Sequence, residues 1–237
     1  MPPHRTQERP VAYYWRDEVM RSRSVSDVVL FGKVDVPAPS ARLMADWQRD
    51  VFLHLKLEPG DVEVLPLARA RMRWPDYRHC VQAVADWTQQ LGLAEVLDSS
   101  EMALMACRGA RYHHDGVQYG GSAFCNLFLS EDQGLDLHFS VTGHRIPLVR
   151  GTVVIFDTGQ PHAVIERGSA GFNVEHFSGQ DGAQVFLTWE LPIEDAHVAR
   201  ALHTVFDVDP ATALLLNEGQ VWLNGAPLHV CPAFGRC

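Results

Sequence analysis

The apolar residues of the first hundred positions recur at helical spacing in two places. After Ser40, a residue suited to cap a helix, apolar side chains return every three or four positions as far as residue 55. This pattern predicts an amphipathic helix that ends before the Pro59-Gly60 turn. A second helical pattern covers 77–91 and is interrupted by Gly92.

Extended structure is predicted on both sides of these helices. The apolar run 25–34 predicts an edge strand, preceded by a first dozen residues that we expect to form a loose arm, so that structure begins near Ser24. Beyond about Met102, short apolar runs alternate with Gly, Asp, Asn and Pro clusters, as in an antiparallel sandwich. The predicted strands are 103–107, 122–130, 135–141, 144–148, 152–156, 162–166, 172–177 and 184–191.

The order of these elements predicts the fold class. Helices that precede a run of strands indicate an α+β, mainly β layout in which the helices brace one face of the sheet. Residues 194–206 are predicted to form a helix, and 221–230 a closing hairpin around Asn224-Gly225. We expect one domain over 1–237, with supporting elements in 1–101, the strand-rich core in 102–191 and closing elements in 192–237.

Charge and composition exclude several classes of partner. The 237 residues hold 20 Lys and Arg against 29 Asp and Glu, a formal net charge of -9, which repels nucleic-acid backbones and anionic membranes. No stretch has the ~20 apolar residues of a membrane span, and the start lacks a secretory signal. With five cysteines lacking C-x-x-C spacing, these features predict a cytoplasmic protein with reduced thiols. The predicted N-terminal strand and the hairpin at 221–230 could each be a sheet edge that pairs with a second copy of the chain, so a homo-oligomer is possible.

The segment 111–164 carries the candidate chemistry. Side chains alternate along an extended strand, so His113 and Asp115 project to one side while His114 points to the other. His162 follows 47 residues after Asp115, next to a turn marked by glycine and proline. Two imidazoles and one carboxylate can occupy one face of a metal and leave other positions open, as in non-haem Fe(II) oxygenases. The same set also suits a catalytic zinc with a bound water.

An ordered series of motifs resembles the Fe(II)/2-oxoglutarate-dependent dioxygenases. The matching segments between about 102 and 191 are His113-His114-Asp115, the strand AFCNLFLS, GLDLHF at 134–139, GTVVIF at 151–156 and PHAV at 161–164. The resemblance implies a double-stranded β-helix (jelly roll) core with the metal in the barrel mouth. It also implies Fe(II), 2-oxoglutarate and O₂ as cofactors, with His113, Asp115 and His162 as metal ligands.

One element departs from the pattern of that family. Its members commonly carry G-x-Arg on the strand after the distal histidine, and the arginine holds the far carboxylate of 2-oxoglutarate. The matching triplet here is Gly171-Phe172-Asn173. The co-substrate-binding candidates are therefore Asn173, Arg167, Arg111 and Asn126.

Asp136 and His138 are candidate substrate-binding residues. They share one face of the strand LDLHF, so they line the pocket if that face is the barrel interior, and belong to the solvated surface if it is the outer face. The side chains on such a face decide what a barrel binds.

The leading hypothesis is an Fe(II) oxygenase that uses 2-oxoglutarate to oxidise, above all to hydroxylate, a C–H bond of a small-molecule metabolite. The missing G-x-Arg keeps a second hypothesis open, an iron oxygenase or oxidase that needs no 2-oxoglutarate. A zinc hydrolase and a non-enzymatic, metal-binding jelly-roll protein are the remaining alternatives.

Overall fold

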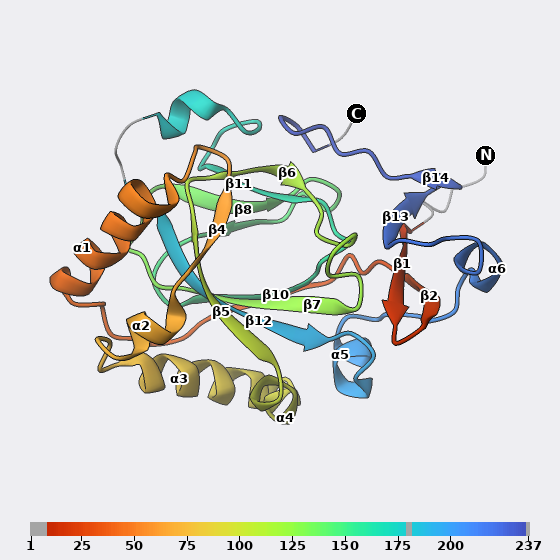
Figure 1. Ribbon diagram of the computed structural model, residues 1–237, viewed down its shortest axis with the longest axis horizontal. Helices are drawn as coiled ribbons and strands as arrows, with labels where there is room; N and C mark the ends of the chain where they lie inside the picture. Colours follow the sequence, from red (N-terminus) through yellow and green to blue (C-terminus); the bar gives the residue numbers. More distant parts are fainter. Residues whose placement is uncertain (1–8, 179–181, 236–237) are drawn as a thin grey trace, which may run out of the picture.

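Two antiparallel sheets face each other at the centre of the computed structural model, which describes residues 9–178 and 182–235 (Figure 1). The larger sheet has the order β3 (Val29–Lys33), β10 (Thr152–Asp157), β7 (Ser122–Phe128), β12 (Gln184–Pro192), β5 (Glu101–Cys107), β4 (Val62–Leu65). The smaller has the order β6 (Ala110–His113), β11 (His162–Glu166), β8 (Leu135–Phe139), β9 (Arg145–Pro147). The predicted mainly β, jelly-roll class is confirmed.

Alternation of side chains gives the larger sheet two buried faces. On one face Leu127, Val153 and Leu187 pack against the helices. On the other, Phe128 and Phe186 belong to the apolar cluster between the two sheets. Strands buried on both sides carry apolar residues at nearly every position, which is why β10 reads TVVIF without polar interruption.

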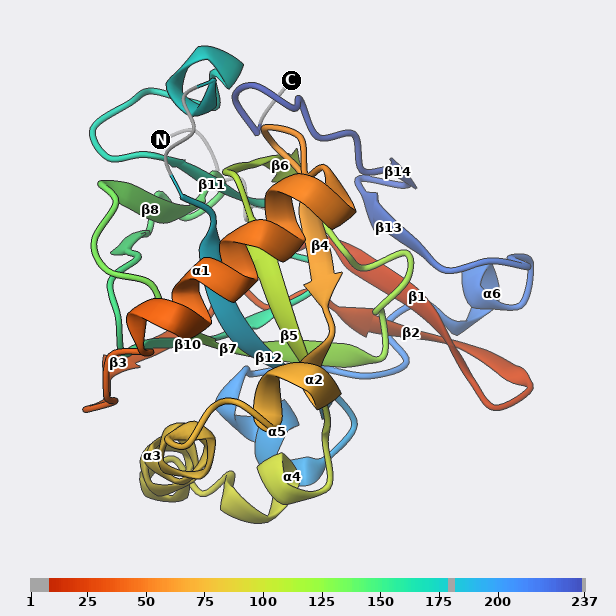
Figure 2. The same ribbon diagram turned by 60° about the vertical axis from the view of Figure 1, so that its left-hand side comes forward.

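Helices cover the outer face of the larger sheet (Figure 2). Helix α1 (Ala41–Arg49) begins where the Ser40 hydroxyl accepts a hydrogen bond from the Leu43 amide, and continues as the π-helix η1 (Asp50–Leu55). Both predicted helices are confirmed, the second as α3 (Tyr77–Gln90). The short helices are α2 (Leu67–Arg71), α4 (Ala94–Asp98), α5 (Ala196–Ala201) and α6 (Pro210–Ala213).

A third sheet corrects the expectation of a loose arm that precedes structure near Ser24. It has the order β14 (Ala226–Pro227), β13 (Gln220–Leu223), β1 (Val11–Arg16), β2 (Val19–Ser24), and residues 1–8 of the predicted arm lie outside the described residues. Tyr13 and Tyr14 are buried, and their strand β1 pairs with β13, which lies far away in the sequence. The segment is therefore held in place by long-range packing. The closing hairpin around Asn224-Gly225 is confirmed by β13 and β14.

Two further predictions differ from the structure. The predicted strand 172–177 is wrong, because Val174–Phe177 forms a 3₁₀ helix, η2, at whose start the Asn173 side chain accepts a hydrogen bond from the Glu175 amide. The predicted helix 194–206 is shorter, since Asp195 caps α5 and the chain leaves the helix after Ala201. Across the part of the chain that the structure describes, no helix combines the length and apolar character needed to cross a membrane.

Gly151 lies in the turn before β10, where the backbone comes close to Val34 just after β3. Its φ is +83°, and an added Cβ would overlap the carbonyl oxygen of Val34. We expect Gly151→Ala to lower the free energy of unfolding by about 2 kcal/mol or more, measured by urea denaturation. Gly134→Ala is the matched control, because its φ of +70° is similar but nothing lies near its Cβ. Equal losses in both variants would contradict the overlap.

Candidate metal centre

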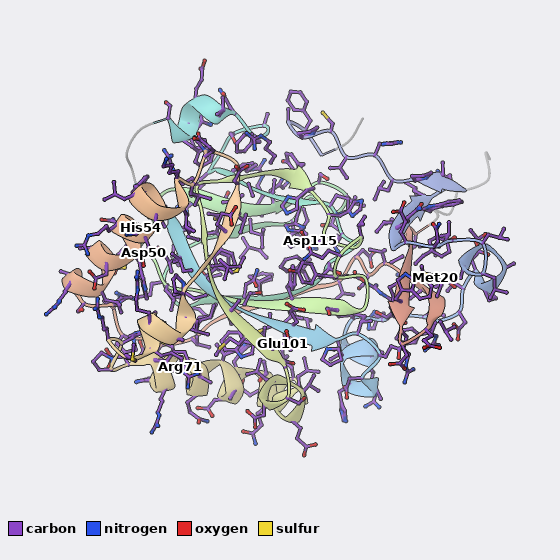
Figure 3. The ribbon with its side chains drawn as sticks, in the orientation of Figure 1. Met20, Asp50, His54, Arg71, Glu101 and Asp115 are labelled. Carbon is purple, nitrogen blue, oxygen red and sulfur yellow. The ribbon has the colours of Figure 1, made fainter. Side chains whose placement is uncertain are left out.

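Three side chains from the H-x-D segment and the distal histidine converge at one end of the smaller sheet. His113 ends β6, His162 begins β11, and the two residues pair directly across the antiparallel strands. Asp115 follows β6 and lies between the two facing sheets (Figure 3). Its carboxylate oxygens are 3.6 Å from His113 Nε2 and 3.5 Å from His162 Nε2. One ligand atom from each residue lies within 4.8 Å of the others.

Backbone carbonyls orient both imidazoles. His113 Nδ1 lies 2.6 Å from the carbonyl oxygen of Arg111, and His162 Nδ1 lies 2.9 Å from that of Gln160. When each Nδ1–H donates to its carbonyl, the Nε2 lone pair of each ring is left facing Asp115. This arrangement, in which the non-ligating nitrogen donates to a fixed acceptor, is typical of metal-binding histidines.

Burial keeps His162 in the neutral form that can bind a metal. Burial lowers the pKa of His162 to about 3, and the nearby His113 acts in the same direction. At neutral pH its imidazole is therefore uncharged and a metal need not displace a proton from it. Burial raises the pKa of Asp115, as expected for a carboxylate that lacks a permanent positive neighbour.

The turns that follow Asp115 and precede His162 are bonded to each other. The Asp115 amide donates to the Thr158 carbonyl oxygen at 2.8 Å, and the Thr158 hydroxyl is 2.7 Å from the Tyr119 carbonyl oxygen. Asp115 also accepts at its own carbonyl from the Tyr119 amide at 2.7 Å. The two segments that carry the ligands are thus one hydrogen-bonded unit.

The donor set fits iron. Two neutral imidazole nitrogens and one carboxylate oxygen on one side of a point are the facial arrangement of non-haem Fe(II) sites, and they leave the positions toward the cavity open. The same donors would also hold a catalytic Zn²⁺. His114 lies beside the cluster but is not one of the three grouped ligands.

A cavity of about 380 Å³ adjoins the three ligands between the two sheets. Its apolar walls include Phe124, Phe128, Leu137, Phe156, Val164 and Phe186. Asn126 and Thr188 face each other across β7 and β12, with the Thr188 hydroxyl donating to the Asn126 side-chain oxygen. Among the described residues that line it, none is an arginine or a lysine. The lining therefore offers no cation to the far carboxylate of 2-oxoglutarate.

The structure brings one of the four co-substrate candidates to this cavity, namely Asn126. Asn173 is exposed and caps η2, in a loop that the sequence predicted as a strand. Arg167 bonds to Asp132 and Asp136 outside the cavity. Arg111 is exposed and bonds to Asp61 at 2.8 Å. The side chains of Asn173, Arg167 and Arg111 thus make hydrogen bonds to other parts of the chain and do not line the cavity.

Asp136 and His138 lie on the outer face of β8, since the cavity-lining residue of that strand is Leu137 between them. Asp136 is buried and accepts a hydrogen bond from Arg167 Nε at 3.0 Å. His138 Nδ1 contacts the Tyr112 hydroxyl. These two side chains therefore point away from the barrel interior. They are not simply solvated, because Asp136 contacts Arg167 and His138 contacts Tyr112.

Several cavity residues escaped the sequence reasoning. Tyr119 and Glu190 line the cavity, and burial raises the pKa of both. Thr188 shares strand parity with Glu190 and Phe186 on β12, so alternation along that strand was the available signal. What the sequence could not supply was which face of β12 lies inward.

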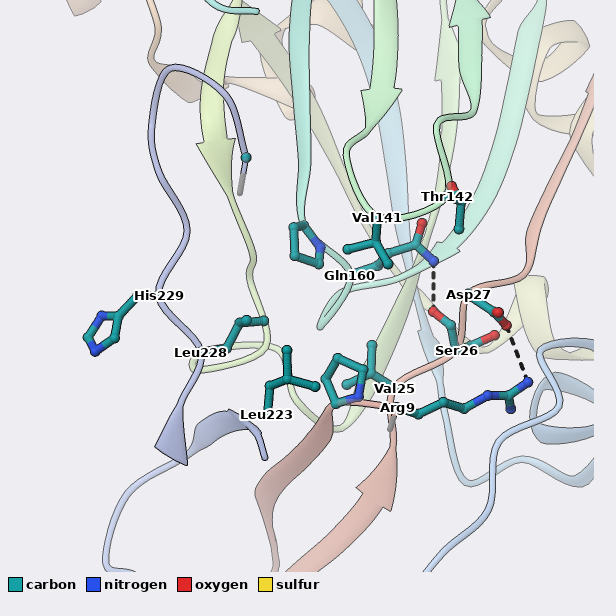
Figure 4. Close-up of a pocket in the computed structure, with 13 residues that line it drawn as sticks. Arg9, Val25, Ser26, Asp27, Val141, Thr142, Gln160, Leu223, Leu228 and His229 are labelled. Atoms are coloured by element: carbon teal, nitrogen blue, oxygen red, sulfur yellow. Dashed lines mark hydrogen bonds and ion pairs between the residues drawn. The ribbon is translucent and has the colours of Figure 1, made fainter. Parts of the chain in front are cut away.

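A second hollow, of about 460 Å³, is lined in part by Gln160 and Pro161 of the turn before His162 (Figure 4). It is bordered by Val25, Ser26, Val141, Gln160 and Leu228. The Gln160 side chain donates to the Ser26 carbonyl oxygen at 2.7 Å, and Arg9 pairs with Asp27 at 3.5 Å. The three candidate ligands are not part of its lining, so this hollow is separate from the candidate metal site.

Comparisons with known proteins give weak similarities. No protein-family model matches the chain, and no curated protein matches its sequence. Among solved structures, a Pseudomonas putida prolyl-4-hydroxylase is 18% identical, with 69% of this chain and 92% of that one covered at a TM-score of 0.38. EvdO2 from Micromonospora carbonacea var. aurantiaca is 11% identical, with 80% and 92% covered at 0.41.

A third similar structure is the non-haem α-ketoglutarate-dependent carbocyclase SnoK of nogalamycin biosynthesis. It is 9% identical, with 88% of this chain and 92% of that one covered at a TM-score of 0.38. Such values carry no residue-level assignment, so the chemistry of this chain rests on its own site.

Proposed function

We propose that this protein is a non-haem Fe(II) oxygenase that oxidises a C–H bond of a small molecule, by hydroxylation above all. The observation that carries the proposal is the cluster of His113, Asp115 and His162 at an apolar cavity. Bound there, iron would supply the activation of O₂, which amino-acid side chains do not perform. Its cavity-facing positions would be those that admit O₂ and an organic ligand.

The residues around the cluster have separable tasks. The three ligands hold the metal, and the carbonyls of Arg111 and Gln160 fix the two imidazole rings. The phenylalanine walls exclude water, which protects a reactive centre from side reactions. Asn126 and Thr188 offer hydrogen bonds that orient a ligand within these walls. The volume of about 380 Å³ lies within the usual range for small-molecule sites.

The sequence resemblance supports a 2-oxo acid as the co-substrate, with 2-oxoglutarate as the first to test. Purified apoprotein is loaded with Fe(II) under argon, 2-oxoglutarate is added, and the visible spectrum is recorded. We expect a weak charge-transfer band from chelation, lost in His113→Ala, and O₂ consumption once air and a substrate are admitted. Iron bound at one equivalent without O₂ consumption under any of these conditions would overturn the oxygenase proposal and favour the non-enzymatic alternative.

The absence of arginine and lysine from the described cavity lining favours a second candidate, an iron oxygenase that takes all its electrons from its substrate. For that enzyme we expect bound iron, no band with 2-oxoglutarate, and O₂ consumption that depends on substrate alone. Metal analysis after anaerobic purification separates both from the zinc hydrolase, which would retain zinc in place of iron.

A further inference from the structure

Glu190 is a carboxylate without a counter-ion in the wall of the cavity beside the candidate metal centre. It lines that cavity together with Thr188 and Phe186, which lie on the same face of β12 because side chains alternate along a strand. Its side chain is half-buried and makes no hydrogen bond or ion pair with any described residue. Burial raises its pKa, and the carboxylate of Glu101, directly opposite on β5, acts in the same direction. The protein itself therefore compensates this negative charge poorly.

Pairing across the larger sheet places Glu190 in the row of side chains that faces the candidate ligands. Glu190 pairs with Phe124 of β7, and Phe124 pairs in turn with Phe156 of β10. The centre of the Phe156 ring lies 4.8 Å from that of the His162 ring. Neighbouring strands are about 4.7–4.9 Å apart, so the backbone of Glu190 lies about 10 Å along this row from that of Phe156. A small molecule held at Glu190 is long enough to reach the candidate metal centre.

Aromatic rings lie beside this carboxylate. Tyr119 and Phe124 both line the cavity, with their ring centres 5.0 Å apart. Burial raises the pKa of Tyr119, and the negative charge of Glu190 adds to the shift, so the phenol and the carboxylate are near each other. An aromatic face attracts a cation, and a carboxylate accepts strong hydrogen bonds from charged N–H groups. Together they suit an organic ammonium group.

Asn126 is an independent sign that the cavity holds a ligand. The residue is 7% exposed, lines the cavity and accepts from the Thr188 hydroxyl at its Oδ1. Its Nδ2, in contrast, donates to no residue in the described part of the chain. Buried amide groups are normally matched by the protein, by water or by what the protein binds. An unmatched donor thus lies one row of side chains deeper than Glu190.

The charge of the lining decides the class of ligand that fits. Glu63 and Glu190 both contribute to it, whereas none of its described residues is an arginine or a lysine. An anion would lose its water here without gaining a counter-charge. A cation gains one at Glu190, and the formal net charge of -9 attracts it to the protein.

We propose that the substrate of this protein is a small organic amine, bound as its ammonium ion by Glu190 and the adjoining rings of Tyr119 and Phe124. This inference rests on the proposed function and deepens it by naming the substrate class. Glu190 is then the residue that selects the charge of the substrate, and the ammonium group fixes which of its carbon atoms reach the candidate metal centre.

The test compares probes that share a phenylethyl body and differ in charge. At neutral pH 2-phenylethylamine is a cation, 2-phenylethanol is uncharged and 3-phenylpropanoate is an anion. Each is titrated by calorimetry under argon into the Fe(II)-loaded protein and into the metal-free protein. We expect the amine to bind about tenfold or more tightly than the alcohol in both forms, since the charge-assisted bond to Glu190 does not involve the metal. The anion should bind most weakly.

Substitutions at Glu190 assign this preference to one side chain. Glu190→Gln keeps the size of the side chain and should remove the preference for the amine, and Glu190→Lys should reverse it in favour of 3-phenylpropanoate. Glu101→Gln is the matched control, because it removes the opposite carboxylate, which is not part of the cavity lining. It should keep most of the preference.

Equal binding of amine and alcohol by the wild-type protein, or binding of neither, would overturn the proposal, as would an unaltered preference in Glu190→Gln. Iron per chain is measured on the same samples, so these results would leave the iron oxygenase intact wherever one equivalent of Fe(II) is bound. A retained preference for the amine in a protein that binds no iron would instead overturn the iron oxygenase and leave an amine-binding site.

Discussion

Replacing His162 with alanine is expected to weaken Fe(II) binding by at least about 100-fold. Loss of a residue that merely orients a metal ligand costs 10–100-fold in affinity, so loss of a ligand itself should cost no less. His162 is also the most buried of the three donors, at 6% exposure. Among the described residues, no fourth His, Cys, Asp or Glu joins this group and could replace it. The measurement is iron per chain after anaerobic loading and desalting, followed by turnover of any substrate found.

His144→Ala is the control for this variant, because His144 is exposed and lies in the turn between β8 and β9 away from the cluster. It should bind one equivalent of iron like the unaltered protein. Circular dichroism of both variants guards against a loss of fold. Retention of stoichiometric, tight iron binding by His162→Ala would show that the three side chains do not form the metal site.

The convergence of the three candidate ligands was predictable because each step of the prediction is local. Strand alternation predicted that His113 and Asp115 point to one side; β6 ends at His113, yet the Asp115 carboxylate does lie 3.6 Å from His113 Nε2. The apolar strand before the turn makes His162 the first residue of the next strand. Antiparallel pairing of these two strands then brings both histidines opposite each other. The antiparallel, mainly β core followed from the density and spacing of short apolar runs, whereas the jelly-roll class was what the resemblance to the Fe(II)/2-oxoglutarate-dependent dioxygenases implied.

Three of the four co-substrate candidates and both substrate candidates do not line the cavity, because their placement depended on long-range register. Asn173 was assigned to a strand after β11, but the chain forms η2 there, and the next strand, β12, begins only at Gln184. The inner face of β8 could not be read from LDLHF, because both of its faces are mostly buried. The sheet that contains β1 and β2 was missed for the same reason, since its partner β13 is distant in the sequence.

A buried ion pair connects the third sheet, which contains β1 and β2, to the segments next to Asp115 and His162. The guanidinium of Arg23, on β2, forms a bidentate pair with Asp157 at 2.6 and 2.9 Å, and both side chains are 0% exposed. Arg23 Nε also donates to the Gly120 carbonyl oxygen at 2.8 Å. Asp157 accepts from the amides of Ser26 and Gly159 at 2.8 Å each. The donors and acceptors of the pair are thus well satisfied.

Asp157→Asn is expected to lower the free energy of unfolding by about 3–5 kcal/mol. It removes one charge of a buried pair and leaves the Arg23 guanidinium desolvated without its partner. Urea denaturation of the metal-free protein measures the loss. Glu131→Gln is the control, because Glu131 pairs with Arg150 at the surface, where such pairs contribute about 0–1 kcal/mol. A loss in Asp157→Asn no larger than in Glu131→Gln would contradict the role of the buried pair.

The same substitution should weaken iron binding without touching a ligand. Asp157 ends β10 just before the turn that leads to His162, Gly120 lies in the turn after Asp115, and Arg23 bonds to both residues. Without the charge pair these turns lose a shared anchor, so we expect iron affinity to fall by about 10–100-fold, as for residues that orient metal ligands. The double variant Arg23→Met/Asp157→Leu separates the two effects. Removing both charges should restore much of the stability, whereas iron affinity should stay low because the double variant lacks the bonds that Arg23 makes to Gly120 and that Asp157 accepts from Gly159.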